Sequence, residues 1–185
     1  MDNTEQRLVT FAGSLRFDEL EPELLHAIKQ RFIDTIGCAL GAFNAESSVI
    51  ARKLASADGI SEGVVLLGTR LKSSPELAAF ANTAMIRCLD LNDDYFGKDG
   101  PHPAIRLEPY WRRPILFNAD GQSYIVAMAI AYEVPCTLVD AVGLREKGWD
   151  YVSFSAIAAA LAVATVLNLS EQQTRHALSL SAVPN

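Results

Sequence analysis

The sequence predicts an all-α fold, a bundle of helices with at most one short strand near residues 64–67. Apolar residues recur at spacings of three and four through most of the chain, which is the pattern of amphipathic helices. Several of these runs begin with a capping residue or a proline followed by an acidic residue, as helices commonly do. With 185 residues, of which 50% are hydrophobic, the chain has the length of one domain and enough apolar surface for a substantial core.

The first part of the chain is expected to contain three helical segments. A short one runs from Glu5 to Gly13, and Pro22 stands near the start of the next, because proline is tolerated in a first helical turn. The apolar positions of this second helix include Leu24, Leu25, Ile28, Phe32, Ile33 and Ile36. A further helix is expected from Ser47 to Ala57, where Asp58 and Gly59 end it.

The middle of the chain is expected to hold the strand and the helix that leads to the candidate site. Val64 to Leu67 is a brief β-branched run, typical of a strand. Ser74 is a good N-cap for a helix from Pro75 to Asp90, with proline at its first position and an acid in its first turn.

Three elements are expected in the last third. A helix from Ser123 to Val139 contains Pro135, which predicts a kink or an early end, because proline cannot donate a helical hydrogen bond. An alanine-rich helix from Val152 to Leu167 reads as buried. Ser170 begins a final helix that runs to about Ala182.

Composition excludes several functions. A net charge of −6 without a basic stripe argues against a nucleic-acid partner. Cys38, Cys88 and Cys136 have neither zinc nor iron–sulfur spacing, so no metal is expected, and they favour reduced thiols in a cytoplasmic protein. The apolar run from Ala156 to Leu169 is too short to cross a bilayer, and no membrane partner is expected.

The segment from Arg87 to His102 carries the candidate chemistry. It places Asp90, Asp93 and Asp94 together with a histidine where a helix gives way to a loop. Neighbouring carboxylates raise one another's pKa, and the negative end of the helix dipole is expected to raise the pKa of Asp90 further. Such a cluster is either a site of proton transfer or a solvated acidic helix end, and the spacing alone leaves both readings open.

Several motifs occur in order along the chain and together resemble one family. They are R-x-L-D-x-N-D at 87–93 followed by H-P at 102–103, D-T-I-G-C-A-L at 34–40, V-V-L-L-G at 64–68, S-P-E-L-A at 74–78, G-W-D at 148–150 and L-S-E-Q-Q at 169–173. This set is similar to the signatures of the MmgE/PrpD family, most of all to its 2-methylcitrate dehydratase branch.

The resemblance implies a lyase without cofactor or metal that removes water from a hydroxylated tricarboxylate, by acid and base catalysis. It implies catalytic roles for Asp90 and His102, and substrate contacts for Arg87, Asn92 and Asp93. Arg87, one turn before Asp90, either grips a substrate carboxylate or neutralises Asp90. The alternatives are a decarboxylase or isomerase of a related polycarboxylate in the same family, or a non-catalytic helical remnant.

Family members are more than twice this long, so residues 1–185 are expected to be the N-terminal part of a helical domain. The second domain and a returning helical segment are then absent, and the chain alone is expected to be inactive. The resemblance also implies a homodimer of the full-length protein, and Tyr151 stands where the family's G-x-D-H-V places histidine.

Residues 104–115 depart from both the helical composition and the family pattern. They contain three arginines, two prolines and a tryptophan, whereas the family continues H-P with S-D-[TN]-I-G and an alanine-rich helix. One permitted set of codons for Pro103 to Ile115, read from the last base of the proline codon, gives S-D-T-I-G-A-I-L-A-A-A-D. The sequence therefore suggests two compensating frame changes here, and the alternative is a genuine basic loop.

Overall fold

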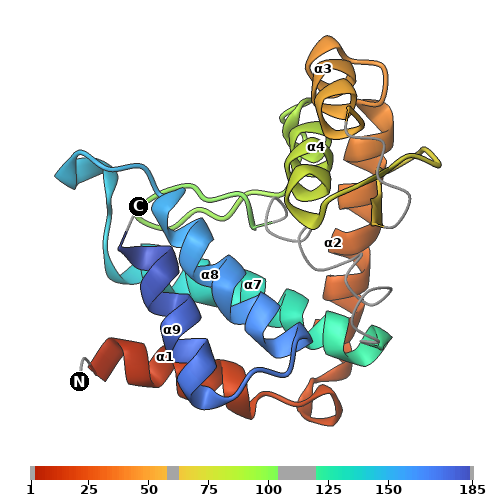
Figure 1. Cartoon of the computed structure of the whole chain (residues 1–185). Coiled ribbons are helices and arrows are strands. Elements are labelled where there is room, and N and C mark those ends of the chain that lie inside the picture. Colours follow the sequence, from red (N-terminus) through yellow and green to blue (C-terminus); the bar gives the residue numbers. More distant parts are fainter. Residues whose placement is uncertain (1–2, 58–62, 104–119, 184–185) are drawn as a thin grey trace.

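A computed structural model describes residues 3–57, 63–103 and 120–183. Within these ranges the protein contains seven α-helices and one two-stranded hairpin, so the predicted all-α class is confirmed. The helices form a larger body and a smaller lobe, and α2 (Pro22–Gly41) runs through both (Figure 1). The suspected frame change at 104–115 lies outside the described residues.

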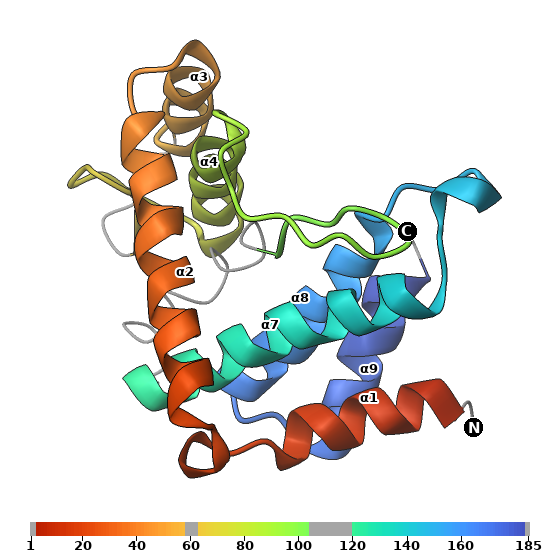
Figure 2. The same ribbon diagram turned by 180° about the vertical axis from the view of Figure 1, so that it is seen from behind.

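The larger body consists of α1 (Asn3–Ser14), α7 (Gly121–Ala141), α8 (Ser153–Val166), α9 (Glu171–Ala182) and the first half of α2. In the view from behind, α7 crosses the lower part of α2 and then runs above α1 (Figure 2). The central apolar cluster joins Ile28 of α2 to Ile130 of α7 and Leu161 of α8, all 4% exposed or less. Alanines at 127, 131, 158 and 162 are fully buried here, because small side chains allow α7 and α8 to approach closely.

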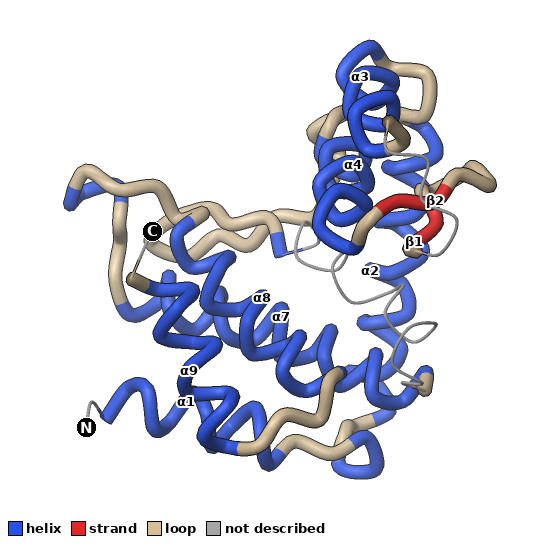
Figure 3. The backbone as a smooth tube through the Cα atoms, in the orientation of Figure 1, coloured by secondary structure: helices blue, strands red, loops and turns tan. Residues whose placement is uncertain are grey.

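The smaller lobe packs α3 (Glu46–Ala55) and α4 (Pro75–Arg87) against the second half of α2. Its hairpin pairs β1 (Val64–Val65) with β2 (Lys72–Ser73) in antiparallel register, Val64 opposite Ser73 (Figure 3). The fully buried Asn82 of α4 accepts a hydrogen bond from the backbone N–H of Leu67 at 2.9 Å. That bond holds the end of the hairpin against the helix.

Two predicted helix starts are confirmed by their capping bonds. Ser74 Oγ accepts from the Leu77 N–H at 3.4 Å, and Ser170 Oγ accepts from the Gln173 N–H at 3.4 Å. The Gln173 side chain also accepts from the Ser170 N–H, which completes a capping box. These interactions are local, which explains why the pattern alone located them.

Apart from shifts of one or two residues at the ends of elements, three features differ from expectation. The strand near 64–67 exists, but it pairs with a second strand at Lys72–Ser73 that the sequence did not indicate. α7 does not end at Pro135 but continues to Ala141, with Pro135 and Val139 buried in the fold. α4 ends at Arg87 rather than Asp90, since Asp90 adopts a left-handed backbone with φ of 53°.

α7 is long and apolar enough, by length and composition, to cross a membrane. Its apolar side chains include Val126, Met128 and Ile130, which lie in the central cluster of the larger body. Packing within the fold therefore accounts for the hydropathy of this helix.

Candidate active site

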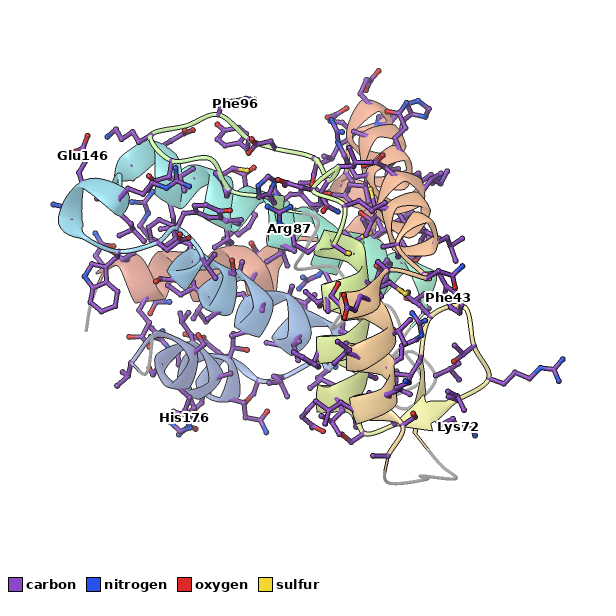
Figure 4. All side chains as sticks on the ribbon, turned by 90° about the horizontal axis from the view of Figure 1, so that it is seen from above. Phe43, Lys72, Arg87, Phe96, Glu146 and His176 are labelled. Carbon is purple, nitrogen blue, oxygen red and sulfur yellow. The ribbon has the colours of Figure 1, made fainter. Side chains whose placement is uncertain are left out.

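Arg87, the first predicted site residue, is the last residue of α4. The others lie on the segment from Cys88 to Pro103, which leaves the end of α4 and reaches across to the larger body (Figure 1). Seen from above, the segment runs from Arg87 past Phe96 over the C-terminal half of α7 (Figure 4). It has no regular helix or strand between Asp90 and His102. Backbone bonds from the Tyr95 N–H to the Pro101 carbonyl at 3.0 Å, and from the Gly97 N–H to the Asp99 carbonyl at 3.2 Å, close it into a narrow loop.

Arg87 and Asp90 form a hydrogen-bonded ion pair at the end of α4. The side chain of Arg87 is 34% exposed and that of Asp90 is 73% exposed. The expected rise in the pKa of Asp90 is wrong. Hydrogen bonding and charge attraction from Arg87 lower that pKa, with a smaller contribution from His102, and they outweigh desolvation of this exposed carboxyl group.

His102 is half-buried, and its ring makes two contacts with other residues. Its Nδ1 lies 3.0 Å from the backbone carbonyl oxygen of Asp93. A carbonyl oxygen only accepts, so the Nδ1–H group is the donor in this contact. The ring also meets the ring of Tyr151 edge to face, with centroids 6.3 Å apart and planes at 63°.

The inner side of the loop faces α2 and α7. The side-chain nitrogen and oxygen of Asn92 are both buried and have no hydrogen-bond partner among the described residues. Burial raises the pKa of the Tyr132 hydroxyl on α7, and the nearby charge of Asp93 raises it further. Burial also raises the pKa of the Cys38 thiol on α2, with Asp34 and Asp93 adding to the effect.

The structure thus brings His102 to Asp93 and Arg87 to Asp90, with His102 close enough to influence the pKa of Asp90. Neither Asp90 nor His102 is buried in the apolar core. The side-chain amide of Asn92 is buried, whereas Asp90 of the Arg87 pair is largely exposed to solvent. Asp94 is exposed, although its Oδ1 accepts the N–H of Tyr95 at 2.9 Å.

Sequence reasoning missed the contribution of Arg145, which lies with Tyr151 in the segment between α7 and α8. Tyr151 is only 8% exposed and packs with Val139 and Phe154 as well as His102. The guanidinium of Arg145 lies 5.4 Å from the centre of the Tyr151 ring, within cation–π range. The resemblance marked position 151, but no local signal indicates that Arg145 reaches it.

The described residues contain no group of three or more His, Cys, Asp and Glu side chains arranged to hold a metal, and the three cysteines are free thiols. A cavity of about 440 Å³ opens between α1, α2 and α7, where Arg31 and Tyr132 line it. Neither Asp90 nor His102 lines this cavity, but Tyr95 of the segment from Cys88 to Pro103 does.

Residues 6–185 match the model of the MmgE/PrpD N-terminal domain. The chain is 29% identical over 167 residues to the probable 2-methylcitrate dehydratase of Saccharomyces cerevisiae, which covers 80% of this chain and 31% of that protein. It is 28% identical over 165 residues to the 2-methylcitrate dehydratase of Escherichia coli K12 and 27% identical over 164 residues to that of Cupriavidus necator. Each of those two matches covers 80% of this chain and 33% of the relative. The chain therefore spans about a third of the length of these curated relatives.

Proposed function

Because this chain belongs to the MmgE/PrpD family, we propose that it is the N-terminal part of the helical domain of a lyase. The proposed reaction is dehydration of a hydroxylated tricarboxylate such as 2-methylcitrate, by acid and base catalysis without a cofactor. The relatives that support this choice of substrate carry the name 2-methylcitrate dehydratase. The observation that carries the proposal is that Arg87 and the half-buried His102 imidazole, which a backbone carbonyl holds, together lower the pKa of the Asp90 carboxyl.

Dehydration beside a carboxylate requires one group to take a proton from carbon and one to protonate the departing hydroxyl. A carboxyl with a lowered pKa is a weak base, so Asp90 is proposed to remain ionised and to stabilise the imidazolium form of His102. His102 is proposed to take the proton from carbon through Nε2, because Nδ1 faces the carbonyl oxygen of Asp93. The imidazolium that forms then gives this proton to the departing hydroxyl, which leaves as water.

Substrate binding is proposed to use Arg87, Asn92 and Asp93. Arg87 has several N–H donors, so its guanidinium is suited to a substrate carboxylate as well as to Asp90. A buried amide without a partner costs about 1–3 kcal/mol, and a substrate hydroxyl or carboxylate would recover that energy at Asn92. Asp93 fixes the loop through its backbone contact with His102.

The isolated chain is proposed to have negligible turnover. Asp90 is largely in water here, and a solvated site gives weak electrostatic stabilisation of a transition state. The rest of the full-length protein is proposed to enclose the site, and its helical domain to form the homodimer in the cytoplasm. Dehydration of 2-methylcitrate by the isolated chain at the rate of a full-length relative would contradict this.

The binding half of the proposal is tested by NMR titration of the chain with citrate and with 2-methylcitrate. Signals of Arg87, Asn92 and His102 are expected to shift with saturation, and Arg87→Gln is expected to weaken the affinity at least tenfold. Arg70→Gln, which removes the same charge in the exposed hairpin turn, is the matched control and is expected to bind normally. Equal loss in both variants, or no saturable shift at any concentration, would overturn a substrate site here.

A second candidate function is a non-catalytic helical module. Tyr151 at the position of the family's histidine and the solvent exposure of Asp90 favour it. A decarboxylase or isomerase within the family is a third. The three reactions are distinguished by their products in a protein that carries this chain together with the remainder of the domain. A dehydratase releases water, a decarboxylase releases carbon dioxide, and an isomerase releases neither but moves a double bond.

A further inference from the structure

The loop that carries Asn92, Asp93 and His102 is irregular, yet its tip is fastened to the C-terminal end of α7. Tyr95 donates its hydroxyl to Asp140 at 2.7 Å, and Lys98 donates to the carbonyl of Ala141 at 2.8 Å. The contact is close, because a Cβ on Gly97 would lie 2.7 Å from an oxygen of Asp140. An irregular segment held this tightly presents its side chains in one arrangement.

Asp99 makes the buried part of this attachment. It is 6% exposed and is the only charged residue among the buried side chains of the described chain. Its Oδ2 accepts a hydrogen bond from the backbone N–H of Leu144 at 2.6 Å. A buried carboxylate is costly unless hydrogen-bonded, and bonds to ionised acceptors are short and strong, so this bond fixes the loop to the turn after α7.

The bond from Asp99 to Leu144 is the first of a series of contacts that leads back to the imidazole of His102. Leu144 is followed by Arg145, whose guanidinium lies over the Tyr151 ring, and that ring meets His102 edge to face. His102 is three residues after Asp99 on the same loop. The bond from Asp99 to Leu144 therefore joins the loop that carries the imidazole to the turn that leads to Tyr151.

We propose that Asp99 is a positioning residue that holds the His102 imidazole against Tyr151, in the place from which the ring takes part in proton transfer. Asp99 acts through the Leu144 N–H and does not contact the reacting atoms. The catalytic meaning of this role rests on the proposed function, but the placement of the ring does not depend on it. Catalytic geometry is sensitive to such placement, because displacements of about 1 Å cost on the order of 100-fold in rate.

The placement is measured by NMR of the His102 ring protons in the full chain, with His26→Gln and His176→Gln used for assignment. The aromatic ring of Tyr151 changes the chemical shifts of these protons, and the Tyr151→Leu variant gives their chemical shifts without that ring. Asp99→Ala is expected to move the His102 signals to the Tyr151→Leu position and to speed hydrogen exchange at the Leu144 amide. The His26 and His176 signals and the helical circular dichroism are expected to stay unchanged.

Lys98→Gln is the matched control, since it weakens the neighbouring exposed bond to Ala141 and is expected to leave His102 in place. If Asp99→Ala does not fold, Asp99→Asn carries the test, because a neutral acceptor weakens the Leu144 bond and moves the His102 signals part of the way. Unchanged His102 signals in a folded Asp99 variant overturn the proposal. Citrate binding is measured separately, so a chain whose His102 responds but which binds no citrate contradicts the proposed function alone.

Discussion

Asn82 offers the most direct test of how the smaller lobe is held together. Its side chain is fully buried, and its oxygen accepts the Leu67 N–H at 2.9 Å. Asn82→Ala removes the acceptor and leaves a buried N–H unpaired, which costs about 1–3 kcal/mol. The vacated space adds about 1 kcal/mol. The expected loss in the free energy of unfolding is thus about 2–4 kcal/mol.

The loss is measured by urea denaturation followed by far-UV circular dichroism. For a chain of this length each kcal/mol lowers the melting temperature by about 2–4 °C, so a decrease of about 4–16 °C is expected. Glu76→Gln, at an exposed position on the same helix, is the control and is expected to change stability by less than about 0.5 kcal/mol. An Asn82→Ala chain within about 0.5 kcal/mol of the parent, with the same denaturant dependence, would refute the role assigned to this bond.

Three further outcomes are expected. Arg87→Gln should raise the pKa of Asp90 toward its ordinary value, as measured by NMR titration of the carboxyl group, and an unchanged pKa would contradict the ion pair. The contribution of this pair to stability is present at neutral pH and disappears as acid protonates Asp90. Tyr132→Phe should make the chain more resistant to alkaline unfolding. The raised pKa of Tyr132 contributes stability that is present below the ordinary tyrosine pKa of about 10 and is lost above it, and equal alkaline midpoints for parent and variant would count against this. Sequencing the DNA that encodes Pro103 to Ile115 should show codons that give S-D-T-I-G in the neighbouring frame, and codons incompatible with that reading would establish a genuine basic loop.

Local signals predicted the fold well, and long-range contacts account for the misses. The caps at Ser74 and Ser170 depend only on residues three positions away, so the sequence located both helices. Pro135 was expected to weaken its helix, but burial of the surrounding apolar residues in the central core stabilises the helix through it. The strand at Lys72–Ser73 has an unremarkable composition and exists because Val64 and Val65 pair with it.

The candidate site was predicted only in part, for the same reason. Its motif named the loop residues, but the pKa of Asp90 depends on the side-chain conformation of Arg87, which a helix dipole argument does not include. The contact between His102 and Tyr151 joins positions far apart in sequence, as does the bond from Asp99 to Leu144. No periodicity or spacing rule relates such pairs.

α2 packs into both apolar cores, so a change in its orientation affects both parts of the fold. Its first half packs through Ile28 into the larger body, while Ala39 packs in the smaller lobe and Gly41 lies against Leu89, next to Asp90. The part of the helix from Ile28 to Gly41 spans about 20 Å, so a tilt of about 10° about Ile28 displaces the far end by roughly 3 Å. A change of packing around Ile28 that tilts α2 would therefore move Leu89 and change the distance between the Asp90 carboxylate and the His102 imidazole.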